Sequence, residues 1–247
     1  MIMIQRARRW MKEYYQDVVV LMVCISMIWV VLYRFVPVPV TFLMVKRMIT
    51  SSSKYDFSYQ WKSWEDIAAF PKVCVMASED QMLPFHNGLD LASLEDAITA
   101  KGKKRMRGAS TVTQQVAKNV YLWPGRSFIR KGFELYFTGL IEAIWTKERI
   151  LEVYLNIAET GEKCFGIEAA ARRYFKKPAS KLNLKESAMI VATLPNPIKY
   201  KAVAPGNYLL KRKSQIEDLF YSLDGKYYLR ELYVRSEKSL YDFSKYN

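Results

Sequence analysis

The chain has 247 residues, of which 51% are hydrophobic, so it is long and apolar enough to bury a substantial core in one large or two small domains. Its three cysteines and single histidine exclude a disulfide framework and argue against a zinc site, and we do not expect Cys74 and Cys164 to pair. The formal net charge of +14 indicates an anionic partner, such as nucleic acid, anionic lipid or a phosphorylated substrate, with a solvated basic surface as the simpler alternative.

The first predicted element is a membrane anchor. Residues 18–33, VVVLMVCISMIWVVLY, carry no charge, and the apolar run continues through FVPVPV beyond Arg34, whose side chain can reach the membrane surface. No small-residue cleavage site follows, which favours an uncleaved anchor over a signal peptide, and a buried core helix is the alternative. Four basic residues precede the span: Arg6, Arg8, Arg9 and Lys12. The positive-inside rule then predicts a cytoplasmic N-terminus and places the bulk of the chain outside.

Composition and periodicity divide the chain into five predicted segments. They are a basic cytoplasmic tail (1–17), a transmembrane helix (18–36), an interfacial segment and linker (37–64), a mainly helical domain (65–210) and a charged, Tyr-rich C-terminal extension (211–247). The domain is predicted to be helical because its apolar residues recur every three to four positions, whereas strand signals are few. The sequence assigns no role to the extension.

Several helices are predicted within the domain. Pro71 suits the first turn of a helix that should end near Asp80. Residues 129–156 are predicted as one long helix or two in series. GIEAAARRYF and LNLKESAMIVATLP are further helices, the second of them stopped by Pro195 and Pro197.

Two adjacent acids, Glu79 and Asp80, stand at the carboxyl end of the helix that begins near Pro71. The helix dipole disfavours negative charge there, and the two carboxylates repel each other. Both effects disfavour the ionised form, which suits a side chain that takes up a proton as a general base. The alternative is an exposed acidic turn neutralised by nearby lysines, and this stretch alone does not choose between them.

The stretch KGKKRMRGASTVTQQVAKN predicts a helix start. Gly108 permits a tight turn, and Thr111 with Gln114 matches a capping box. The unpaired amides of a helix N-terminus favour phosphate, and Lys118 follows two turns into the helix. An ordinary cap on a basic loop is the simpler alternative.

The stretch RSFIRKGFE places two cations beside a carboxylate. On a helix, Arg130 and Glu134 are i,i+4 neighbours, and Lys131 and Glu134 are i,i+3 neighbours. The simpler interpretation is a surface salt bridge. The other is a cationic face with an embedded carboxylate, suited to a pyrophosphate or a metal-bound phosphate.

Together these stretches form an ordered set of motifs. In chain order they are EDQMLPFHNGLD (79–90), GASTVTQQVAKN (108–119), RSFIRKGFE (126–134), KERILEVYLN (147–156), GIEAAARRYF (166–175) and LPNP (194–197). Over residues 65–200 the set resembles the peptidoglycan glycosyltransferases of family 51, and the anchor resembles that of the monofunctional members. The resemblance implies a mainly α fold: a lysozyme-like, two-lobed glycosyltransferase domain, one lobe of which dips into the membrane, with an N-terminal transmembrane helix.

The resemblance also implies an activity. These enzymes polymerise lipid II into β-1,4-linked glycan strands by inverting displacement at the donor anomeric carbon, with release of polyprenyl diphosphate. An anionic leaving group of this kind is stabilised by cations and needs no protonating acid, unlike the leaving oxygen in glycoside hydrolysis. A lysozyme-like lytic transglycosylase or hydrolase is the alternative enzyme, and a membrane-tethered basic binding module is a third interpretation.

Residue roles follow from the resemblance position by position. Glu79 matches the base that deprotonates the acceptor 4-hydroxyl, with Asp80 in support, and Glu134 matches a residue near the donor pyrophosphate, acting directly or through a divalent metal. Positions that match substrate contacts of the second motif are Ser110, Gln114, Gln115, Lys118 and Asn119. Positions that match cations holding the leaving group are Arg126, Arg130 and Lys131. We expect His86 to be structural.

Partners and location are implied as well. No cofactor is expected to be tightly bound, and the resemblance allows a divalent cation (Mg or Mn) at the donor pyrophosphate. The expected partners are lipid II, the growing glycan strand, the lipid bilayer and other cell-wall synthases. Nucleic acid is not expected, because the chain faces outward and lacks aromatic–basic interleaving. The expected location is the bacterial inner (cytoplasmic) membrane, with one span, a cytoplasmic N-terminus and a periplasmic catalytic domain.

Overall fold

The computed structural model describes residues 2–50, 55–90, 110–125 and 127–233, and the chain divides into two units, Met1–Val36 and Pro37–Asn247. The first unit is the single helix α1 (Ile2–Phe35). Its segment Tyr14–Phe35 has a mean hydropathy of 2.4, so by length and composition it is able to cross a membrane. The predicted span falls largely within this segment.

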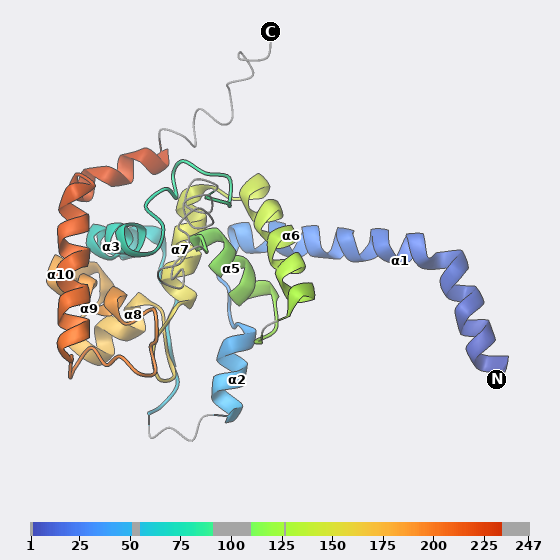
Figure 1. Ribbon diagram of the computed structural model, residues 1–247, viewed down its shortest axis with the longest axis horizontal. Helices are drawn as coiled ribbons and strands as arrows, with labels where there is room; N and C mark the ends of the chain where they lie inside the picture. The colour runs from blue at the N-terminus through green and yellow to red at the C-terminus, as the bar shows by residue number, and fades with distance from the viewer. Residues whose placement is uncertain (1, 51–54, 91–109, 126, 234–247) are drawn as a thin grey trace, which may run out of the picture. The chain divides into compact units, whose positions relative to one another are not determined.

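The second unit is mostly helical, which confirms the predicted fold class (Figure 1). Its elements are α2 (Phe42–Thr50), β1 (Ser58–Tyr59), η1 (Trp64–Asp66), α3 (Ala69–Glu79), α5 (Val112–Tyr121), α6 (Phe128–Ile144), α7 (Lys147–Ile157), β2 (Glu159–Gly161), β3 (Cys164–Phe165), α8 (Ile167–Ala170), the π-helical turn η2 (Ala171–Phe175), η3 (Ala179–Lys181), α9 (Leu184–Ala192), α10 (Asn207–Ser222) and η4 (Gly225–Leu229).

The predicted ends of α3, α5 and α9 agree with the structure, and local features of the sequence set each of them. Pro71 lies in the first turn of α3, and Asp80 is the residue that caps its carboxyl end. The capping box of α5 is present: the Gln114 amide donates to Thr111 Oγ1 at 3.2 Å, and the Thr111 amide donates to Gln114 Oε1 at 3.1 Å. Helix α9 ends at Ala192, three residues before Pro195.

The stretch predicted as one helix or two is two helices, α6 and α7. Trp145 and Thr146 both leave the helical conformation, with ψ angles of 153° and 157°. The Thr146 hydroxyl accepts a hydrogen bond from the Arg149 amide at 3.2 Å, so it caps the second helix. This break lets α7 take its own direction, and α7 packs against α3.

The core of the second unit forms around α3. This helix packs against α7, α9, α10 and η4, and residues 71–77 are all buried. Helix α9 is buried over residues 187–192 in the same way. Helix α5 packs against α6 and α7, and α2 packs against α5. The second unit also contains a small sheet with the strand order β1–β3–β2, in which β1 is parallel and β2 antiparallel to β3.

The C-terminal part is integrated with this core as far as the structure describes it. Residue 211, the expected start of an extension, lies inside α10, and this helix packs against α3 and α9. After a turn through Asp224 (φ 66°) and Gly225 (φ 60°), η4 packs against α3. Residues 234–247 of the predicted extension lie outside the described residues.

The cysteines show no pairing in the described part of the chain. Cys74 and Cys164 are both buried and free. Burial raises the pKa of the Cys74 thiol to about 12, and the nearby charge of Glu217 adds to this effect. Such a thiol stays protonated at neutral pH and behaves as a small apolar core residue.

Candidate active site

Glu79 is the last residue of α3 and is half-buried. The Gln115 Nε2 amide of α5 donates to Glu79 Oε2 at 3.2 Å, and the Ser78 hydroxyl donates to Glu79 Oε1 at 3.2 Å. The Tyr154 hydroxyl of α7 donates to Gln115 Oε1 at 3.2 Å. This contact orients the Gln115 amide with its N–H group toward Glu79.

Tyr154 has no role in the sequence-based prediction. Burial raises its pKa well above 10, and the nearby charges of Glu79 and Asp80 raise it further, so the hydroxyl remains a hydrogen-bond donor. Its only signal in the sequence is its place within the motif KERILEVYLN (147–156), because the distance to Glu79 depends on how α7 packs.

Asp80 is buried, with 7% of its surface exposed, and its partners are neutral. The Val112 amide donates to Asp80 Oδ2 at 2.8 Å, and His86 Nε2 lies 3.0 Å from both carboxylate oxygens. Val112 is the first residue of α5, so the N-terminus of one helix offsets the unfavourable C-terminus of the other. Asp80 is therefore not part of an exposed acidic turn neutralised by lysines.

His86 acts within the turn that follows Asp80. Its Nδ1 accepts a hydrogen bond from the Gly88 amide at 3.0 Å, so the ring proton lies on Nε2 and points to Asp80. Gly88 has φ 88°, and a Cβ there would lie 2.6 Å from Thr138 Cγ2, so only glycine fits. The Lys147 ammonium donates to the His86 carbonyl at 2.6 Å and fixes the turn against α7. These contacts agree with the structural role expected for the imidazole.

Glu134 lies at the centre of a cationic group on α6, formed by the buried Arg130 and the half-exposed Lys131. Arg130 Nη1 lies 3.3 Å from Glu134 Oε2, and Lys131 Nζ lies 2.5 Å from Glu134 Oε1, so both predicted pairs form. Glu134 is 4% exposed and Arg130 is 9% exposed, so their pair is not an ordinary surface salt bridge, whereas the Lys131 side chain is 45% exposed. Arg130 Nε is buried and has no hydrogen-bond partner among the described residues. Such a donor is available to an anionic ligand.

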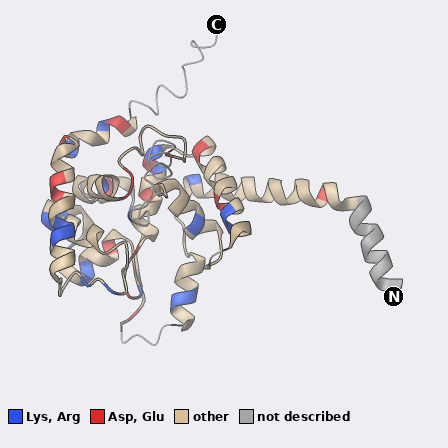
Figure 2. Cartoon of the chain, viewed as in Figure 1, with Lys and Arg blue, Asp and Glu red and all other residues tan. Residues whose placement is uncertain are grey.

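Lys118 of α5 lies near charged residues from both parts of the site, Glu79 and the cationic group around Glu134. Burial lowers its pKa, the charges of Glu134 and Glu79 oppose this shift, and those of Arg130 and Lys131 add to it. The charge of Glu79, the candidate base, and the charges of the cationic group therefore both influence the pKa of the Lys118 ammonium. Arg130 and Lys131 contact the Glu134 carboxylate and Lys118 adds a third positive charge near it, which leaves an excess of positive charge for an anion. Figure 2 shows Lys and Arg on both α5 and α6.

The other predicted site residues are less closely grouped. Ser110 is exposed and directly precedes the cap of α5, and Asn119 is half-buried one position beyond Lys118. Gln114 is buried and its side chain is engaged by the Thr111 amide, so its contact in this structure is to the helix cap. Arg126 lies outside the described residues, as do Gly108 and Ala109.

The residues around Glu134 do not fit a divalent cation held by the protein. Its two carboxylate oxygens face Arg130 and Lys131, and cations at those distances compete with a metal ion for the same lone pairs. In the part of the chain that the structure describes, no three His, Cys, Asp or Glu side chains come together as a candidate ligand set.

The family model and the curated relatives that this chain matches agree with each other. The family model described as Transglycosylase matches residues 46–219. Curated proteins named biosynthetic peptidoglycan transglycosylase, from Yersinia pseudotuberculosis serotype O:3 (strain YPIII) and Yersinia pestis (strain Pestoides F), are each 45% identical over 215 residues. The alignment covers 85% of this chain and 89% of each relative.

Proposed function

This chain belongs to the transglycosylase family, and we propose that its site polymerises lipid II into β-1,4-linked glycan strands with release of polyprenyl diphosphate. It is a peptidoglycan glycosyltransferase, and the lytic alternative is not favoured. The observation that carries the proposed mechanism is Arg130, a buried cation beside Glu134 whose Nε has no hydrogen-bond partner among the described residues and is available to an anionic leaving group.

In this mechanism, Glu79 is the general base. It takes the proton from the 4-hydroxyl of the acceptor sugar while that oxygen attacks the donor anomeric carbon. The bond from that carbon to the diphosphate oxygen breaks, the electron pair leaves with the diphosphate, and the α-linked donor becomes a β-linked product. Gln115 and Ser78 hold the carboxylate by hydrogen bonds, one to each oxygen.

The departing diphosphate is stabilised by Lys118, Arg130 and Lys131. Charge develops on the leaving oxygens as the bond breaks, and fixed cations favour that state over the ground state. Glu134 orients Arg130 and Lys131 through its two ion pairs. Because both of its oxygens face cations, Glu134 is unsuited to the proton donation that a glycoside hydrolase requires.

The second unit carries an apolar surface suited to a substrate with a polyprenyl tail. On α6, Phe128 is 99% exposed and Ile129 is 73% exposed, and on α2, Phe42 and Ile49 are 45% and 78% exposed. Exposed aromatic and aliphatic side chains of this kind partition into a membrane interface. We therefore propose a single-pass protein of the bacterial inner membrane, with a cytoplasmic N-terminus and a periplasmic catalytic unit. Association with other cell-wall synthases stays a prediction.

The activity is tested with the purified full-length chain in detergent and fluorescent lipid II. We expect long glycan strands on gel separation, which lysozyme then digests. Shortening of preformed glycan without polymerisation would instead identify the lytic alternative.

The role of Glu134 is tested by Glu134→Gln. We expect kcat/KM for lipid II to fall about a hundredfold, because Arg130 and Lys131 lose the partner that orients them. If Glu134 acts only on these cations, the loss is the same across a titration of Mg²⁺ or Mn²⁺. A loss that excess divalent ion reverses would show that Glu134 is a metal ligand.

A further inference from the structure

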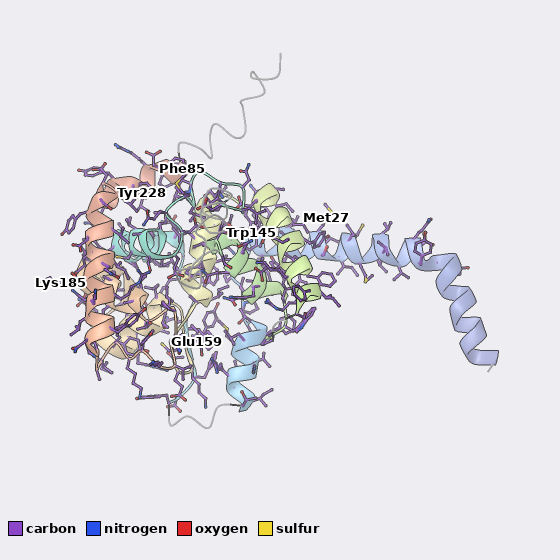
Figure 3. The ribbon with its side chains drawn as sticks, viewed as in Figure 1. Met27, Phe85, Trp145, Glu159, Lys185 and Tyr228 are labelled. Carbon is purple, nitrogen blue, oxygen red and sulfur yellow. The ribbon has the colours of Figure 1, made fainter. Side chains whose placement is uncertain are left out.

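The last described part of the chain contacts the segment that carries the base. The family match ends at residue 219, and η4 follows it at residues 225–229. The Tyr228 hydroxyl of η4 donates to the Gln81 carbonyl, and its ring centroid lies 6.5 Å from that of Phe85 (Figure 3). Tyr228 therefore contacts the chain directly after Glu79 and Asp80.

A second contact comes from α10. Arg212 Nη2 donates to the Ser78 carbonyl at 3.1 Å and to the Ser78 hydroxyl oxygen at 2.9 Å. The Ser78 hydroxyl in turn donates to Glu79 Oε1 at 3.2 Å. Carbonyl groups in the last turn of a helix lack partners within the helix, and a guanidinium there also offsets the dipole. Arg212 satisfies such a carbonyl next to the catalytic carboxylate.

The turn before η4 explains how Tyr228 reaches this place. Asp224 and Gly225 both have positive φ angles, which reverse the chain after α10. The Lys226 ammonium lies 4.1 Å from the centroid of the Phe70 ring, and Phe70 also packs on Phe220 at 5.8 Å between centroids. These contacts fasten η4 to α3.

We propose that Arg212 and Tyr228 are positioning residues, which together hold residues 78–85 so that the Glu79 carboxylate faces the cationic group. The inference rests on the proposed function, because it concerns the same base. Neither side chain touches the reacting atoms. Both act on backbone carbonyls on either side of Glu79, at Ser78 and Gln81. A displaced base slows the chemical step more than it weakens substrate binding, because reaction rates depend steeply on the alignment of the reacting groups.

The test uses Tyr228→Phe, which removes the hydroxyl but keeps the ring on Phe85, and Arg212→Gln with Arg212→Lys as its conservative partner. We expect kcat for lipid II polymerisation to fall about fivefold in Tyr228→Phe and in Arg212→Gln, as for the loss of one hydrogen bond, with KM within about twofold of wild type. Arg212→Lys should recover part of the loss. The control Tyr227→Phe changes a neighbouring side chain that is 71% exposed, and it should match wild type.

Two results would overturn the inference while leaving the proposed function intact. One is wild-type kcat in both Tyr228→Phe and Arg212→Gln. The other is a loss of kcat that equals the fraction of each variant unfolded at the assay temperature, as measured by thermal denaturation. Such a loss would indicate a purely structural role. Absence of strands with the wild-type chain would instead refute the proposed function, and this inference with it.

Discussion

Glu79→Gln is expected to lower kcat for glycan polymerisation about a thousandfold, within the range found for loss of a general base. Glutamine keeps the size of the side chain and can still accept the hydrogen bond that Gln115 donates at 3.2 Å to Glu79. It cannot take the proton of the acceptor hydroxyl. Binding of lipid II, measured separately by equilibrium titration, should remain largely intact.

The matched control for this substitution is Asp218→Asn, which removes one exposed carboxylate on α10. It changes the net charge by the same amount and should leave kcat at the wild-type value. Near-normal polymerisation by Glu79→Gln would refute the assignment of the base. A thermal denaturation curve that matches wild type excludes unfolding as the reason for any loss.

Lys118→Met is expected to lower kcat/KM for lipid II about a hundredfold, as for the loss of one preorganised electrostatic contact. Methionine fills most of the volume of lysine but carries no charge. Burial already lowers the pKa of Lys118, so this ammonium is poorly solvated and gains from an anionic ligand. Steady-state kinetics with labelled lipid II gives the ratio directly.

Its control is Lys185→Met on α9, where the side chain is exposed (Figure 3). This substitution also removes one positive charge, so it reports any effect of net charge on binding to the membrane or to lipid II. Kinetics of Lys118→Met equal to those of Lys185→Met would remove Lys118 from the stabilisation of the leaving group.

Parts of the site could be predicted from local sequence. The capping box of Thr111 and Gln114, the end of α3 near Glu79, and the pairs of Glu134 with Arg130 and Lys131 all form between residues at most four positions apart. Within one helix or cap, backbone geometry alone fixes which of these side chains can meet. Such features need no knowledge of how helices pack.

The environment of the two acids could not be predicted in this way. The sequence places Glu79 and Asp80 at an unfavourable helix end, but the amide that satisfies Asp80 belongs to Val112, 32 positions along the chain. The long-range partner of Glu79 is Gln115, and that amide is oriented by Tyr154 of a third helix. These contacts depend on the direction that α7 takes after Thr146.

The sequence alone determined that the protein is mainly helical, that it carries an apolar helix near residues 18–36, and that it carries the motifs of a family that joins sugars. The period of the hydrophobic residues, the capping residues and the spacing of the charges are local properties of the sequence. They can therefore be recognised without knowledge of tertiary contacts. Only the tertiary structure placed Lys118 where the charges of Glu79 and Glu134 influence its pKa, and brought Arg212 and Tyr228 to the end of α3. Burial and long-range hydrogen bonds arise only when helices pack, and they set the surroundings of these side chains.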